Sequence, residues 1–96
     1  IFNAPLREGD GREKFELAFR ERILAPLRNF SPDLVIISAG FDAHRNDPLG
    51  GLDLVEADFM WATEELCAIA DKQAGGRVVS MLEGGYDLAG LARSVA

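Results

Sequence analysis

One carboxylate and one phenol directly follow the two most apolar segments of the chain. Asp42 comes after the run Leu34–Ser38, and Tyr86 comes after the run Val78–Leu82. In an open α/β sheet, ligands bind just beyond the carboxyl ends of parallel strands, so polar residues there are candidates for chemistry. A carboxylate can coordinate a metal ion, and a neutral phenol can donate a hydrogen bond to a developing oxyanion.

The long loop over residues 39–54 offers other candidate ligands besides Asp42. Asp42 lies nearest the strand, where the backbone is held and the carboxylate can be aimed, although it could instead cap backbone amides or pair with Arg45. Asp47 precedes Pro48 and has the context of a turn residue whose side chain bonds back to its own loop. His44 could join Asp47 as a ligand pair, but on its own it is expected to be a surface or hydrogen-bonding residue.

Two glycines before Tyr86 leave its surroundings free of side chains. Through Gly84 and Gly85 a ligand could approach the phenol closely, although Tyr86 could equally pack under the loop with its hydroxyl in water. Glu83 could act as an acid or base, or accept hydrogen bonds from backbone amides. Gly50 and Gly51 permit tight backbone paths in the first loop.

The remaining pattern predicts the elements that position these residues. Phe15, Phe19, Ile23 and Leu27 recur every four residues and predict a helix over about 12–28, with Pro26 disturbing its last turns. Asp10 is the expected N-cap of this helix, and residues 1–9 are expected to form the end of a strand and a loop. Phe15, Phe19 and Trp61 are expected to be packing residues, and Cys67 a small buried hydrophobe.

A strand, a helix and a second strand should follow in order. The unbroken apolar run over 34–38 predicts a strand covered on both faces. A helix over about 55–72, a strand over 78–82 and a helix starting near Leu88 with Asp87 as its N-cap complete the chain. A connection this long implies a right-handed crossover between parallel neighbours, so both loops should emerge at one edge of an α/β sheet.

Composition narrows the class of protein. A net charge of −6 and a pI near 4.6 argue against a nucleic-acid surface, and a single cysteine excludes an internal disulfide. No apolar run approaches the roughly 18 residues that a membrane span needs, so we expect no membrane partner and a cytoplasmic location. Since the chain begins at Ile1 and two strands cannot make a buried parallel sheet alone, we expect a piece of a longer protein.

Three ordered motifs carry a family resemblance. They are Ser38-Ala-Gly-Phe-Asp42-Ala, Asp47-Pro-Leu49-Gly-Gly51 and Leu82-Glu-Gly-Gly-Tyr86-Asp-Leu88. Together they resemble the C-terminal part of the catalytic domain of zinc-dependent histone deacetylases, closest to class II and the bacterial acetylpolyamine amidohydrolase-like members. The likeness covers essentially residues 1–96, which we expect to be a C-terminal fragment of one such domain.

The resemblance implies a role for each matching residue. Asp42 matches the second of the family's two zinc-binding aspartates, and Tyr86 matches the tyrosine that hydrogen-bonds the substrate carbonyl. Leu49 matches an apolar residue of the acyl-lysine channel, and Gly84 and Gly85 match its adjoining wall. The implied fold is the arginase/deacetylase-like three-layer α/β fold with a mainly parallel sheet.

Several family features have no counterpart among these residues. The tandem histidines, the Asp-x-His zinc ligands and the structural K⁺ ligands are absent, so the isolated chain is expected to be inactive. The expected function of the complete protein is hydrolysis of acetylated lysine or an acetylated small amine with Zn²⁺. Alternatives are a nucleotide- or phosphate-binding α/β domain with Glu83-Gly-Gly as its cradle, or a non-catalytic interaction domain. Apolar strands without neighbours could also form a homo-oligomer.

Overall fold

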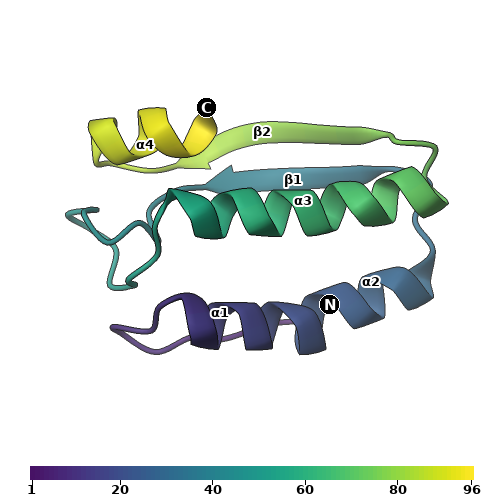
Figure 1. Cartoon of the computed structure of the whole chain (residues 1–96), viewed down its shortest axis with the longest axis horizontal. Helices are drawn as coiled ribbons and strands as arrows, with labels where there is room; N and C mark the ends of the chain where they lie inside the picture. The colour runs from purple at the N-terminus through teal and green to yellow at the C-terminus, as the bar shows by residue number, and fades with distance from the viewer.

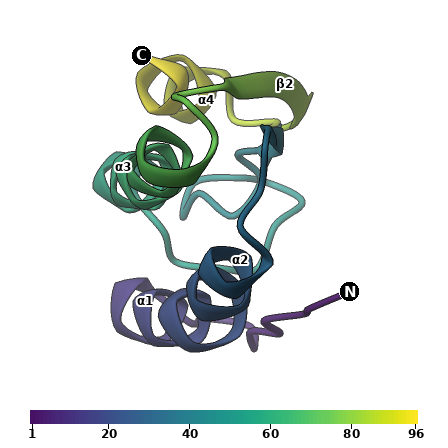
Figure 2. The same cartoon turned by 90° about the vertical axis from the view of Figure 1, so that its right-hand side faces the viewer.

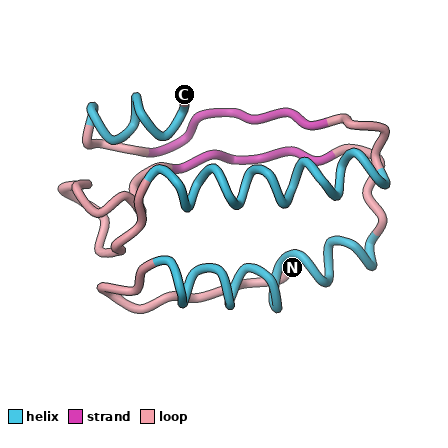
Figure 3. The backbone as a smooth tube through the Cα atoms, viewed as in Figure 1, coloured by secondary structure: helices cyan, strands magenta, loops and turns pink.

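Two parallel strands and a set of helices make up the computed structural model, which describes all residues 1–96 (Figure 1). The strands form a two-stranded sheet in the order β1-β2, confirming the predicted parallel pair and the α/β class. Figure 3 shows that helices alternate with the two strands along the chain. The elements are α1 (Arg12–Phe19), η1 (Arg20–Leu24), α2 (Ala25–Phe30), β1 (Val35–Gly40), α3 (Glu56–Gln73), β2 (Val78–Gly84) and α4 (Leu88–Val95).

The first helix runs without a break through α1, η1 and α2, but its middle turn is wider than an α-helical turn. Residues 20–24 form a π-helix, in which the amide of Ala25 donates to the carbonyl of Arg20 five residues earlier. Pro26 follows immediately, and a proline within an α-helix lacks a donor and crowds the carbonyl four residues before it. That carbonyl belongs to Arg22, which lies within the π-helical turn. The helix thus departs from α-helical geometry just before Pro26, as the expected disturbance there predicts.

Two predictions near the N-terminus are wrong. The N-cap of α1 is Gly11 in an extended conformation, with no side-chain cap. Asp10 instead accepts a hydrogen bond from the amide of Arg7 at 2.8 Å, so its carboxylate closes the preceding turn rather than capping the helix. Residues 1–7 form no strand, since no other segment of the structure pairs with them.

The core of the sheet is formed with α3. Val35 is buried with Ala70 and Ala74 of α3, and Ile37 and Val78 pack against them. The opposite face, which carries Ile36, Val79 and Met81, is exposed. The expectation of a strand covered on both faces is therefore wrong for this chain, because α3 is the only helix that shares a buried core with the strands.

An aromatic cluster joins the first helix to α3. The ring of Trp61 meets Phe15 and Phe19 edge-on, at centroid separations of 6.0 and 5.8 Å. Viewed along the long axis, α3 lies between the α1–α2 helix and α4 (Figure 2). The aromatic residues are packing residues, as predicted, and Cys67 is only partly buried. None of the helices combines the length and the apolar character that a membrane-spanning helix needs.

Candidate functional site

The carboxyl ends of β1 and β2 lie side by side. Gly40 is the register partner of Gly84, and the amide of Phe41 donates to the carbonyl of Gly84 at 2.8 Å. The loop after β1 and the turn after β2 therefore leave the sheet at the same edge, at the left of Figure 1. The parallel crossover expected from the sequence is confirmed, and with it the common edge.

Asp42 presents a free carboxylate at this edge. Its side chain is exposed and makes no hydrogen bond or ion pair. A Cβ added at Gly84 would lie 3.2 Å from its Oδ1 and 3.5 Å from its Oδ2, so the carboxylate lies over the end of β2. The alternative pairing with Arg45 is not formed, because Arg45 is bound to Asp53 at 2.9 Å.

The loop between β1 and α3 is folded back tightly on Asp42. A Cβ at Gly50 would lie 1.7 Å from the backbone oxygen of Asp42, so only glycine fits there. The amide of Arg45 donates to Leu54 at 2.8 Å and closes the base of the loop. Leu49 stands on the outside of this fold with 75% of its surface exposed.

Asp47 holds the two loops together. Its Oδ1 accepts from the amides of Leu49 at 2.8 Å and Gly50 at 2.9 Å, which confirms the predicted turn role. Its Oδ2 accepts from the amide of Tyr86 at 2.7 Å, a contact across 39 positions that no local pattern indicates. Burial alone would raise the pKa of the Asp47 carboxyl, but the hydrogen bonds from these amides outweigh it and hold the pKa below its ordinary value.

Tyr86 is anchored through its backbone while its phenol is free. The side chain is 53% exposed and its hydroxyl makes no hydrogen bond, which argues against the alternative of a tyrosine packed under the loop. The preceding Gly85 has φ +131°, a conformation that residues with a side chain rarely adopt. A Cβ at Gly85 would also meet Phe41 and Leu91 at 3.1 Å.

His44 lies inside the loop rather than on the surface. It is only 2% exposed; its Nδ1 accepts from the amide of Asn46 at 3.1 Å, and its Nε2 lies 3.3 Å from Oε1 of Glu56. Glu56 also bonds Arg93 of α4, and this hydrogen bond is the largest cause lowering the Glu56 pKa to about 2. The hydrogen-bonding role expected of His44 is present, and the expectation of a surface position is wrong.

The N-terminus of α4 is already occupied by a carboxylate. Asp87 Oδ2 accepts from the amide of Gly90 at 2.8 Å, confirming the predicted N-cap. A phosphate bound at this helix end would meet the negative charge of Asp87. Glu83 is exposed and makes no hydrogen bond. This arrangement argues against the phosphate-cradle alternative.

The chain supplies one candidate metal ligand at this edge. No group of three or more His, Cys, Asp or Glu side chains in the structure could hold a metal ion. A catalytic zinc site uses about three protein ligands. The free carboxylate of Asp42 fits one of those positions, whereas His44 and Asp47 are engaged within the protein.

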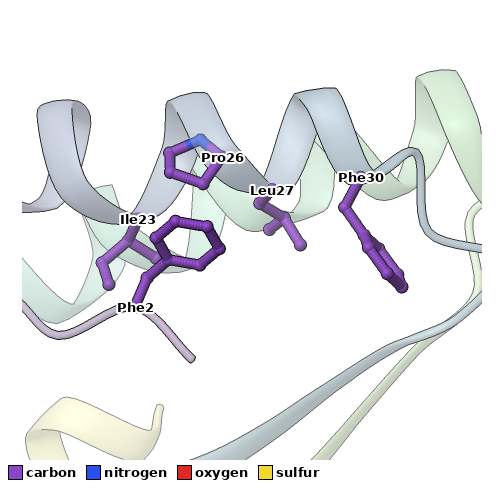
Figure 4. Close-up of a pocket in the computed structure, with 5 residues that line it drawn as sticks. All are labelled: Phe2, Ile23, Pro26, Leu27 and Phe30. Carbon is purple, nitrogen blue, oxygen red and sulfur yellow. The ribbon is translucent and has the colours of Figure 1, made fainter.

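The apolar surface pocket in Figure 4 is separate from this edge. It has a volume of about 280 Å³ and is lined by Phe2, Ile23, Pro26, Leu27 and Phe30, from the N-terminal segment and the η1–α2 part of the first helix. None of the candidate site residues contributes to it.

Comparison with known proteins identifies the family. The family described as histone deacetylase domain matches residues 1–96, and the chain belongs to this family. It is 42% identical over 94 residues to "Histone deacetylase 10, chloroplastic" of Oryza sativa, covering 98% of this chain and 21% of that protein. It is 37% identical over 84 residues to "Histone deacetylase-like amidohydrolase" of Pseudomonas aeruginosa, covering 88% of this chain and 22% of that protein.

A solved structure has the same fold. The crystal structure of the HDA15 HD domain superposes with a TM-score of 0.87 at 40% identity, covering 97% of this chain and 25% of that chain. The resemblance drawn from the three motifs is thereby confirmed, as is the deacetylase-type α/β fold. The chain spans about a fifth of the length of the curated relatives it matches.

Proposed function

We propose that residues 1–96 form the C-terminal part of a single catalytic domain of a zinc-dependent deacetylase. The complete enzyme hydrolyses the N-acetyl amide of lysine or of a small amine such as a polyamine. Membership of the histone deacetylase family supports the reaction type, and relatives named as histone deacetylases and as an amidohydrolase support hydrolysis of an acetylated amide. The reaction adds water across the acyl C–N bond and releases acetate and the amine.

One observation carries this proposal. The unpaired carboxylate of Asp42 lies against Gly84, which is 42 positions later in the sequence and only two positions before Tyr86. A potential metal ligand and a potential hydrogen-bond donor thus share one edge. A metal-dependent amide hydrolase can use that pairing, because the carbonyl oxygen gains negative charge when water attacks and both a metal ion and a hydrogen-bond donor stabilise it.

Asp42 would hold the zinc ion together with ligands from the rest of the domain. When bound, zinc supplies a Lewis acid and lowers the pKa of a coordinated water. Asp42 is suited to this position because no cation or amide competes for its carboxylate. Its exposed side chain also leaves room for further ligands.

Tyr86 would donate its phenolic hydrogen to the acetyl carbonyl oxygen as charge develops there. Its hydroxyl is free to do so, since it has no partner within the chain. Leu49, exposed and apolar, would contact the methylene chain of the acylated side chain. Gly84 and Gly85 would form the adjoining channel wall, since they bring no side chain into it.

The test uses the full-length enzyme with an acetyl-lysine peptide and an acetylated polyamine as substrates. Tyr86→Phe should retain zinc and lower kcat by about 10²- to 10³-fold, the usual cost of removing one oxyanion donor. Unchanged turnover would reject the role of Tyr86. A well-folded wild-type protein with neither zinc nor turnover on either substrate would instead favour the non-catalytic interaction domain.

A further inference from the structure

The buried carboxylate of Asp47 connects the two parts of the proposed site. It is 7% exposed, and all three of its hydrogen bonds come from backbone amides. Its Oδ1 accepts from amides of the loop after β1, and its Oδ2 accepts from an amide of the turn after β2. No cation pairs with it, so its charge is balanced by peptide dipoles alone.

The amide of Tyr86 has no other partner to fix it. Gly85 lacks a side chain that could brace the turn, and the phenol of Tyr86 makes no hydrogen bond of its own. The chain is next held at Asp87, which caps α4. Between the end of β2 and that cap, the backbone is held by the Asp47 carboxylate, which accepts from the amide of Tyr86 at 2.7 Å and is also stabilised by the next amide, that of Asp87.

The other oxygen of Asp47 acts on Leu49. It accepts from the amides of Leu49 and Gly50, so it sets the direction in which the Leu49 side chain leaves the loop. The same rigid group therefore relates the position of Leu49 to that of Tyr86.

We propose that Asp47 is a positioning residue that holds the Tyr86 phenol and the Leu49 side chain at a fixed spacing around the acyl group. This inference rests on the proposed function. Asp47 does not touch substrate; it acts on kcat through Tyr86 and on KM through Leu49. Displacing a catalytic group by about 1 Å can cost up to about 10²-fold in rate.

Asp47→Asn in the full-length enzyme tests the inference. An amide side chain has only one acceptor oxygen, so it can keep the bonds to Leu49 and Gly50 or the bond to Tyr86, but not both. We expect zinc content to be unchanged and kcat per zinc-loaded enzyme to fall about 10- to 100-fold. Asp53→Asn, which changes an exposed carboxylate of the same loop, is the matched control and should leave kcat unchanged.

A double mutant separates positioning from general damage to the fold. If Asp47 acts on kcat through the Tyr86 hydroxyl, then Asp47→Asn should lower kcat by less than about twofold when Tyr86 is already Phe. The change in KM, which arises from Leu49, should persist in the double mutant. A purely structural role would instead lower kcat by the same factor in both backgrounds, and that result would overturn the inference.

Two further measurements cover the remaining outcomes. Asp47→Glu keeps the buried charge and moves the carboxylate by one methylene, so it should show the same non-additive loss if Asp47→Asn does not fold. A crystal structure of either variant in the complete domain should show the Tyr86 ring displaced. A normal kcat for Asp47→Asn beside a low kcat for Tyr86→Phe refutes only the positioning role, whereas a normal kcat for Tyr86→Phe refutes the proposed function.

Discussion

The carboxylate of Asp42 and the α-carbon of Gly84 face each other across the ends of the two strands. A methyl group at Gly84 would lie 3.2 Å from Oδ1, 3.4 Å from Cγ and 3.5 Å from Oδ2 of Asp42. The shortest of these contacts is closer than ordinary van der Waals packing. The missing side chain at Gly84 therefore provides the space in which the carboxylate lies.

Gly84→Ala should push the Asp42 carboxylate away from the end of β2. We expect weaker zinc binding and a fall in kcat/KM of about 10-fold, because a displacement of a few tenths of an ångström is smaller than the 1 Å shift that costs about 10²-fold. Zinc affinity and kcat/KM of the full-length enzyme measure the effect. Ser80→Ala, an exposed change on the same strand, should alter neither, and equal values for both variants would contradict the prediction.

Asp42→Ala should remove a metal ligand. Elemental analysis of the purified full-length protein should show a loss of zinc, with a matching loss of turnover. Glu64→Ala removes an exposed carboxylate of α3 that makes no ion pair, and it should retain the metal. Stoichiometric zinc in Asp42→Ala would exclude Asp42 as a ligand.

Glu56 should make stability depend on pH in the acid range. The hydrogen bond from Arg93 is the main cause that lowers its pKa from 4.5 to about 2. Because the pKa of Glu56 is lower in the folded state, ionised Glu56 stabilises the fold. This stabilisation is fully present above pH 4.5 and is lost progressively as the pH falls through about 2.

Urea midpoints of wild type and Glu56→Gln measure this effect between neutral pH and pH 2. The difference between the two proteins should be largest near neutral pH and should shrink as the pH falls below 4.5. Glu56 also lies near His44, so His44→Gln serves as a second comparison. A difference that stays constant over the whole range would contradict the assigned ionisation.

Asp87→Ala should loosen the helix that follows Tyr86. The Asp87 side chain caps α4 through the amide of Gly90, and removing such a cap costs about 1 kcal/mol. Hydrogen exchange at the first amides of α4 should become faster. Asp87→Ser, which keeps a short acceptor, should retain most of the protection, so equal exchange in both variants would argue against the cap.

The chain expressed alone should be inactive and should associate. Ile36, Val79 and Met81 share an exposed face of the sheet, and both strands have an open edge. Size-exclusion chromatography with light scattering should show species larger than the 10.4 kDa chain. A monomer with cooperative unfolding and measurable deacetylation would contradict the prediction.

Features set by local pattern were predicted well from the sequence. The helix expected over 55–72 spans Glu56–Gln73, and the strand expected over 78–82 spans Val78–Gly84. Both are specified by periodicity and by the glycines near their ends. The common edge of the two loops also followed, because a long connection between parallel strands has a fixed hand.

Features that depend on distant partners could not be predicted in this way. The bond between Asp47 and Tyr86 joins two loops whose separation is decided only when the strands pair. Asp10 has the residue type of an N-cap, but its carboxylate accepts a hydrogen bond from the amide of Arg7 instead. The exposed face of the strands was not predicted, because an apolar run indicates only that a strand can be buried. It does not indicate whether this chain contains an element that covers it. The roles of Asp42, Leu49, Gly84, Gly85 and Tyr86 remain predictions for the experiments above.

The π turn over η1 has a consequence for how the first helix tolerates change. A turn with hydrogen bonds to the fifth residue back holds one residue more than an α-helical turn, and each residue of an α-helix accounts for about 100° of rotation. Phe15 and Phe19 before the turn face Trp61, whereas Ile23 and Leu27 at and after it line the pocket with Phe2. Deleting a single residue between 20 and 24 would rotate one half of the helix about its axis relative to the other half. Residues 20–24 should therefore tolerate substitutions far more readily than a deletion or an insertion.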